Sequence, residues 1–227
     1  MNQPLRAEVT AADIAQLLAE VDGYAWRLGR SRHDFLDPAL ICEQTGIAED
    51  RVRELLEGAE PQQPPREKTA REAFFRTLVA QRLTLARRLR ARGTPAAREG
   101  LRTIAGGTGI SSTQVAHLLN GDRSARLDHV WRLEEYFGVP EGFFSRTEGE
   151  ALGAHLRKMA RVDLPVLVLR TGMQEMDATG VALRATGDLS PEETLRQLVP
   201  AFDALAARLR AQDRAAHRAS GQDTEQA

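Results

Sequence analysis

Residues 111–117 carry the side chains best suited to recognising another polar molecule. The run is Ser-Ser-Thr-Gln-Val-Ala-His, and Ser111 and Gln114 have the spacing of a helix capping box. At helical spacing Val115 faces inward, so the short polar side chains around it face outward. Such side chains can donate and accept hydrogen bonds at the base edges of a DNA major groove, which is about 12 Å wide. The residues that we expect to face bases are Ser111, Ser112, Thr113, Gln114 and His117.

Polar and basic residues on both sides of this run are suited to phosphate contacts. Such contacts position a protein on DNA without reading its sequence. We expect them from Asn120, Arg123 and Arg126, which follow the run, and from Arg102, which precedes it. His117 has a second interpretation, as a solvated surface histidine. Of the arginines on the preceding helix we expect one or two to reach the DNA backbone and the others to be solvated: Arg82, Arg87, Arg88, Arg90 and Arg92.

Two short helices and a tight turn must position these side chains. Gly109 can adopt the left-handed conformation that a tight turn between helices requires. Ala105 is small, which lets the two helices approach closely. The apolar positions that hold both helices to the rest of the domain are Ile104, Ile110, Val115 and Leu118. The pattern predicts a helix-turn-helix whose second helix, residues 111–119, enters the major groove.

The charge is distributed unevenly along the chain, although the whole chain has a net charge of only −1. Residues 66–132 hold 14 Lys/Arg and five Asp/Glu, a net charge of +9. Residues 1–65 have a net charge of −6, and residues 133–227 have −4. A polyanion responds to the local patch and not to the average. Double-stranded DNA is therefore the expected partner, and a chance cluster of solvated arginines is the alternative.

A second copy of the pattern begins 63 residues earlier, where residues 40–58 read LICEQTGIAEDRVRELLEG. The turn glycine recurs as Gly46, and Cys42 takes the place of Ala105 as a small buried residue. The other matched positions are Ile41 with Ile104, Thr45 with Thr108, Ile47 with Ile110, Val52 with Val115 and Leu55 with Leu118. The repeat predicts a second helix-turn-helix in the N-terminal region.

The outward face of this first copy is chemically different. Arg51 stands opposite Gln114, and the positions of Ser111, Ser112, Thr113 and His117 hold Ala48, Glu49, Asp50 and Glu54. Phosphates repel carboxylates, and only an occasional Glu or Asp reads a cytosine. We expect this copy to have kept the fold, lost tight DNA binding and become a protein-interaction or intramolecular module. A plain structural bundle is the alternative.

Helical periodicity and capping signals recur along the whole chain, and no strand pattern is found. Thr10, Thr69 with Glu72, and Thr94-Pro95 are expected to begin helices, and Pro200 to kink the last one. A helix over 127–137 has an apolar stripe of Leu127, Val130, Trp131, Leu133 and Phe137. The other expected helices are 11–29, one from Asp37-Pro38, 49–56, 69–93, 148–161, 164–177 and 191–210. The fold class is therefore all-α.

Changes in composition divide the chain into segments with separate expected roles. A proline-rich linker, residues 61–68, is the clearest boundary. Apolar stripes at the C-terminal end favour dimerisation, since two half-sites are read better than one. The expected parts are a helix-turn-helix-like domain at 1–60, the DNA reader at 69–146, a helical dimerisation domain at 147–211 and a disordered tail at 212–227.

The sequence of the central part resembles the phage repressor/Cro (XRE-type) DNA-binding domain. The resemblance lies in TIAGGTGISSTQVAHLLNG and in LDHVWRLEEYFGVPEGFF. Residues 71–210 are further similar to the EspR-type regulators of actinobacteria, which end in a segment like VALRATGDLSPEETLRQLVPAF. The resemblance implies a five-helix reader and a homodimer that acts as a transcriptional regulator. One departure matters, because the second helix of the motif here has no Arg or Lys.

Other classes of function have less support. The single cysteine, Cys42, excludes an internal disulfide, and the five histidines lack metal-ligand spacing. No catalytic pattern or cofactor motif is found, so we expect no enzyme. No signal segment or apolar run of membrane-spanning length is found, so we expect a cytoplasmic protein. The open alternatives are an adaptor or anti-sigma-like protein-interaction module and a nucleoid-associated architectural DNA-binding protein.

Overall fold

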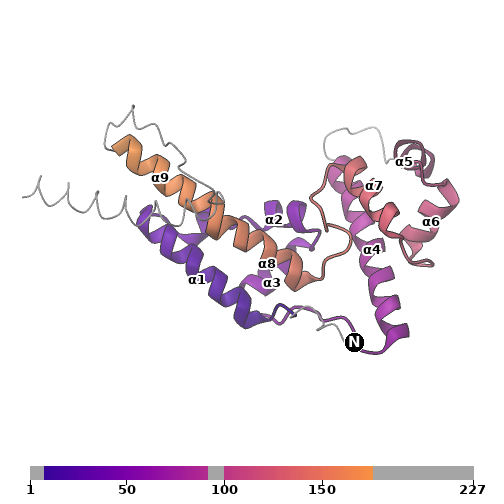
Figure 1. Cartoon of the computed structure of the whole chain (residues 1–227), viewed down its shortest axis with the longest axis horizontal. Helices are drawn as coiled ribbons and strands as arrows, with labels where there is room; N and C mark the ends of the chain where they lie inside the picture. Colours follow the sequence, from indigo (N-terminus) through magenta and orange to yellow (C-terminus); the bar gives the residue numbers. More distant parts are fainter. Residues whose placement is uncertain (1–7, 92–99, 176–227) are drawn as a thin grey trace, which may run out of the picture. The chain divides into compact units, whose positions relative to one another are not determined.

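The computed structural model describes residues 8–91 and 100–175, and these residues form helices joined by turns and loops, with no strand among them (Figure 1). The chain is all-α, as the sequence predicts. The helices are α1 (Ala11–Arg27), α2 (Pro38–Thr45), α3 (Glu49–Leu56), α4 (Lys68–Ala91), α5 (Leu101–Thr108), α6 (Ser112–Asn120), α7 (Leu127–Phe137), α8 (Glu148–Lys158) and α9 (Leu164–Glu175). No helix in these two stretches is both long and apolar enough to cross a membrane.

The described residues divide into two compact units. The first comprises residues 8–19, 32–91 and 100–156, and the second comprises residues 20–31 and 157–175. The proline-rich segment lies inside the first unit, where the Gln62 backbone N–H donates to Glu148 Oε2 at 3.0 Å. The Gln63 side chain donates to the Val9 carbonyl at 3.1 Å. This segment is therefore held in place by hydrogen bonds. The boundaries of the functional parts that we expect from the sequence stay a prediction.

Three helix ends lie where their local sequence predicts them. Thr10 caps α1, because its hydroxyl accepts from the Asp13 N–H and the Asp13 carboxylate accepts from the Thr10 N–H. Asp37 caps α2 by accepting from the Ala39 N–H at 2.9 Å, with Pro38 in the first turn. Gly138, with φ of +64°, ends α7.

The start of α4 differs from the prediction. Thr69 and Glu72 do not form the expected capping box. Instead, the Glu67 carboxylate accepts from the N–H groups of Thr69 (2.8 Å) and Ala70 (2.6 Å), and α4 begins at Lys68. Glutamate is long enough to fold back onto these donors, a geometry that the capping-box pattern does not include. The expected helix start at Thr94-Pro95 lies outside the described residues, and α5 begins at Leu101 after an extended Gly100.

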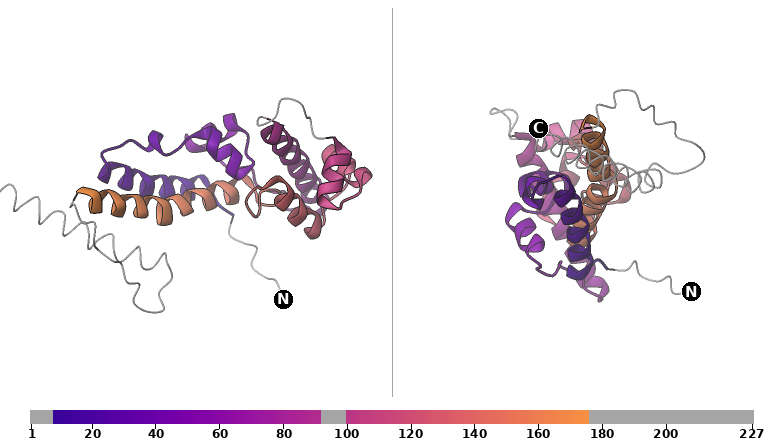
Figure 2. Two further views of the ribbon diagram at one scale, coloured as in Figure 1. Left: turned by 90° about the horizontal axis from the view of Figure 1, so that it is seen from above. Right: turned by 90° about the vertical axis from the view of Figure 1, so that its left-hand side faces the viewer.

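Helices α4, α5, α6 and α7 pack together around one apolar core (Figure 2). The sequence identified the inward positions of α5 and α6, and all of them are buried. The core residues are Leu83, Ala86, Ile104, Ile110, Val115, Leu118, Leu133, Phe143 and Phe144. Burial of these apolar side chains makes the main contribution to the free energy that holds α6 in place.

The apolar stripe expected on α7 is wrong at two positions. Leu133 is fully buried, and Val130 and Phe137 are partly buried against the core. Leu127 and Trp131, one helical turn apart, are instead 85% and 61% exposed. Apolar periodicity cannot separate residues that face the core from residues that face out beside them.

The region 148–175 is more continuous than the two separate helices expected there. Between α8 and α9 the chain forms a π-helical turn, Met159–Asp163, in which the Leu164 N–H reaches the Met159 carbonyl. Pro165 has no N–H and crowds the preceding turn, and a π-turn absorbs this within a helix. The helix expected over 191–210, the kink at Pro200, the tail from 212 and most of the expected dimerisation domain lie outside the described residues.

Candidate nucleic-acid interface

The turn between α5 and α6 is built from three consecutive residues with separate roles. Thr108 is buried, and its hydroxyl donates to the Ile104 carbonyl at 2.7 Å and accepts from the Ile110 N–H at 3.2 Å. Gly109 has φ of +66°, the left-handed conformation that glycine adopts without strain. Ile110 then returns to the core. The turn is therefore fixed from inside and leaves the start of α6 at the surface.

The first turn of α6 presents the polar residues that the sequence singled out. Ser111 is the N-cap, and its hydroxyl accepts from the Gln114 N–H at 3.2 Å. Ser111, Ser112 and Thr113 are exposed, whereas Gln114 is half-buried. Val115 and Leu118 on the opposite face are fully buried. The helix thus pairs a fixed apolar face with a free polar one.

His117 lies one turn further along the same exposed face and has an acidic neighbour. Its Nδ1 is 3.3 Å from Asp122 Oδ2, and 34% of its side chain is exposed. The pair orients the imidazole and leaves a carboxylate beside α6. Sequence spacing alone does not predict this role of Asp122, although the acid directly follows the helix-ending Asn120-Gly121.

The predicted phosphate-binding residues all lie on the surface. Asn120 ends α6, Arg123 and Arg126 lie between α6 and α7, and Arg102 lies on α5, and all four are exposed. The structure adds Arg132 of α7, which the sequence analysis did not single out. Its Nη1 is 3.5 Å from the Gly109 carbonyl oxygen, so a further guanidinium group lies at the turn. The sequence carries no local signal for this role, because the packing of α7 on α5 brings position 132 to the turn.

The arginines of α4 correct one expectation, because two of them have structural roles. Arg82 is only 1% exposed, and its Nη1 donates to the Phe143 carbonyl at 2.6 Å. Burial lowers the pKa of Arg82 to about 10, and this charge is not available to DNA. Arg90 donates to the Tyr136 carbonyl and lies over the Tyr136 ring, 4.4 Å from its centre. The net charge of this segment thus overstates the surface charge.

The turn of the first copy (residues 40–58) has the same backbone conformation and hydrogen bonds as the turn of the second copy (residues 103–121). The Thr45 hydroxyl donates to the Ile41 carbonyl at 2.6 Å and accepts from the Ile47 N–H at 3.3 Å. Gly46 has φ of +72° and ψ of +12°, against +66° and +14° at Gly109. Both glycine N–H groups bond the carbonyl four residues back at 2.9 Å. The turn conformation and these hydrogen bonds therefore recur in both stretches.

The charged side chains on the outward face of the first copy form ion pairs. Arg51, the counterpart of Gln114, donates to Glu148 Oε2 from Nε and Nη2, both at 3.1 Å, and to Glu54 at 2.7 Å. The hydrogen bond to Glu148 is the main reason that the pKa of Arg51 is raised. Arg53 pairs with Glu49 and Asp50. Both cations of α3 are thus neutralised by carboxylates, and the rest of its exposed face is acidic.

Comparison of this chain with protein-family models, with curated proteins and with solved structures finds no match. The function of the chain is therefore inferred from its residues and their geometry.

Proposed function

We propose that this protein is a sequence-specific DNA-binding transcriptional regulator of the XRE type that reads the major groove with α6. The observation that carries the proposal is the division of α6 into two faces. Val115 and Leu118 fix the helix in the core, and Ser112 and Thr113 stand free at its start. A recognition helix needs a rigid support and short hydrogen-bonding side chains at its N-terminal end.

The flanking groups supply the charge that α6 itself lacks. Arg123 and Arg126 are exposed after the C-terminal end of α6, Arg102 is exposed at the start of α5, and Arg132 lies at the turn. Guanidinium groups in these places would contact phosphates on both sides of the groove. We further propose that two copies of the chain act as a homodimer, because paired half-sites raise affinity and specificity.

The first copy has another role in this proposal. Its cations are bound to its own carboxylates and to Glu148, so its outward face repels a phosphate backbone. DNA is then read by one of the two helix-turn-helix copies in each chain.

The test is selection of genomic DNA fragments by the purified full-length chain at near-physiological salt. The wild type is compared with a Gln114→Ala/His117→Ala double variant. Enrichment of a shared palindromic or repeated site, lost in the double variant, is the expected result. No enrichment, or enrichment that both proteins share and that modest salt abolishes, would overturn the proposal.

The exposed pair on α7 favours a second candidate function, a protein-interaction module. Leu127 and Trp131 form an apolar patch beside the helix-turn-helix, and such patches often mark protein contacts. The absence of Arg and Lys from α6 also favours a protein-interaction module. Salt separates the two functions, because DNA affinity falls steeply with salt and apolar contacts do not weaken in this way.

A further inference from the structure

A groove of about 500 Å³ lies in the first unit, between the α2–α3 turn and α4. Gly46, Ile47 and Ala48 of the turn line one side of it, and Leu119 of α6 also lines it. Its volume is within the range of small-molecule sites, about 300–1,000 Å³. The α4 residues that line it follow the helical period and so share one face of that helix: Leu78, Gln81, Arg82, Leu85 and Arg88.

Arg82 is the buried cation of this wall. Only 1% of the residue is exposed, and its Nη1 donates to the Phe143 carbonyl at 2.6 Å. Its other two nitrogens, Nε and Nη2, are buried and have no hydrogen-bond partner. Every N–H of a guanidinium is a donor, and a buried donor without an acceptor destabilises the fold. An acceptor is therefore missing beside Arg82.

The nearest carboxylates do not supply that acceptor. Three of them attract the Arg82 guanidinium through charge, without a hydrogen bond to it. Each of the three accepts a hydrogen bond elsewhere: Glu148 from Arg51, Glu134 from the Phe144 N–H and Glu150 from the Thr147 N–H.

The two unpartnered nitrogens of Arg82 lie on one edge of the guanidinium group. In this planar group the N–H of Nε and one N–H of Nη2 point in parallel, and such an edge matches the two oxygens of a carboxylate. Arg88 is exposed at the same groove and adds a second positive charge. Arg51, which also lines the groove, is neutralised by Glu54 and Glu148. The groove therefore favours an anion.

We propose that this groove binds a small organic monocarboxylate with an apolar body. Its two oxygens would accept hydrogen bonds from Nε and Nη2 of Arg82, and Arg88 would add to the attraction. The apolar body would cover Leu85 and Leu119, which are only partly buried, and displace water from them. Glu148 at the same groove disfavours a second negative charge. The site does not depend on the proposed DNA function.

The burial of the two donors determines which head group fits. Nε and Nη2 are covered from solvent, so the carboxylate reaches them only when a side chain of the wall moves. Gln81 and Arg88 are exposed and long, and exposed side chains change rotamer rapidly. A flat, singly charged carboxylate needs less space and loses less hydration than a phosphate group, and its hydrogen bonds are stronger where water is excluded.

Isothermal titration calorimetry on the full-length chain tests the site with acetate, hexanoate and benzoate as probes. Hexanamide and benzamide have the same bodies without the charge, and inorganic phosphate tests the choice of head group. The Nε–H resonance of Arg82 in a proton–nitrogen NMR spectrum reports direct contact, because a carboxylate that accepts from this donor shifts it.

Two variants change the site in different ways. Arg82→Lys keeps the positive charge and removes the paired Nε and Nη2 donors. Ala48→Trp fills the groove from an exposed position, and its matched control is Gln44→Trp, at an exposed position that does not line the groove. Thermal unfolding of each variant shows whether the fold is intact. If Arg82→Lys does not fold, Ala48→Trp and the Arg82 resonance decide.

Saturable binding of at least one carboxylate, about one per chain, with a shift of the Arg82 resonance, is the expected result. Arg82→Lys and Ala48→Trp should each weaken binding about tenfold or more, and Gln44→Trp should not. Absence of saturable binding for all three carboxylates, or equal binding by wild type and Ala48→Trp, would overturn the proposal. An amide or phosphate that binds as tightly as the best carboxylate would also overturn it.

Discussion

Gly46 and Gly109 hold the same place in the two copies but have different surroundings. Both adopt the left-handed conformation. A Cβ on Gly109 would lie 3.2 Å from Arg132 Nη1, the mobile end of a long side chain. On Gly46 it would lie 3.0 Å from both Arg82 Cδ and the rigid Phe143 ring. The two positions therefore separate the cost of backbone strain from the cost of close packing.

We predict that Gly109→Ala lowers the free energy of unfolding by ~1–2 kcal/mol, the cost of a left-handed L-residue. Gly46→Ala has the same backbone cost and an added steric cost of ~1–3 kcal/mol, because a ring in a packed core cannot move aside. Urea denaturation of both variants measures the difference. Equal losses, or a larger loss for Gly109→Ala, would contradict the packing described around Gly46.

Single residues also mark where sequence reasoning succeeds and fails. The inward positions of the repeat, such as Ile41 and Ile104, follow from spacing alone and are buried as expected. The burial of Arg82 does not follow from spacing, because its partner is the carbonyl of Phe143, 61 residues away. The contact between His117 and Asp122 likewise needs the geometry of the loop that follows α6.

At the scale of elements, the same helix-turn-helix supports two different surfaces. α6 presents uncharged polar residues, and α3 presents carboxylates with two arginines held among them. The helical spacing of the apolar residues causes both segments to form helices. The outward residues determine what each helix can contact. Helix ends are less predictable. The sequence places the start of α2 at Asp37-Pro38 correctly but assigns the cap of α4 to Thr69 and not to Glu67.

The cap of α4 leads to a pH-dependent prediction. Hydrogen bonds from the Ala70 and Thr69 N–H groups lower the pKa of Glu67. A carboxyl group with a lowered pKa in the folded state stabilises the fold above its unfolded pKa, and this contribution is lost as pH falls through the folded value. Glu67→Ala should therefore lower the melting temperature near neutral pH, and the difference from wild type should shrink toward about pH 3.

Glu72→Ala is the matched control for this prediction. Glu72 is an exposed acid of the same helix and takes no part in the observed cap. Thermal unfolding of both variants across the pH range checks the assignment. A larger or more pH-dependent effect for Glu72→Ala would restore the capping box that the sequence predicted.

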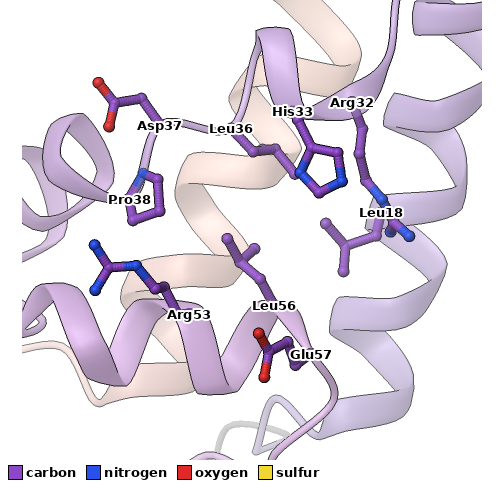
Figure 3. A pocket seen from close by; sticks show the side chains of 9 residues that line it. All are labelled: Leu18, Arg32, His33, Leu36, Asp37, Pro38, Arg53, Leu56 and Glu57. Atoms are coloured by element: carbon purple, nitrogen blue, oxygen red, sulfur yellow. The ribbon is translucent and has the colours of Figure 1, made fainter.

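At the scale of the whole molecule, net charge alone is a poor guide to function. The chain has a net charge of −1, yet exposed arginines follow α6 and exposed carboxylates lie along α3. The all-α class and the repeat follow from the sequence because both depend on local period. The pocket lined by Leu18 and Leu56 does not, because it is formed by residues that are far apart in the sequence (Figure 3).

In the proposed function α6 reads DNA and α3 does not. The repeat supplies two double variants at equivalent positions, Thr113→Ala/His117→Ala in α6 and Asp50→Ala/Glu54→Ala in α3. All four side chains lie on outward faces, so neither variant removes a core residue.

The decisive measurement is fluorescence anisotropy of these two variants and the wild type on a selected DNA duplex over a range of salt concentrations. We predict that wild-type affinity falls steeply with salt, and that the α6 variant binds about tenfold more weakly or worse at every salt concentration. The α3 variant should bind as tightly as wild type or slightly more tightly, since it loses two carboxylates. Equal weakening of both variants, or wild-type binding that salt does not change, would contradict the assignment of DNA reading to α6.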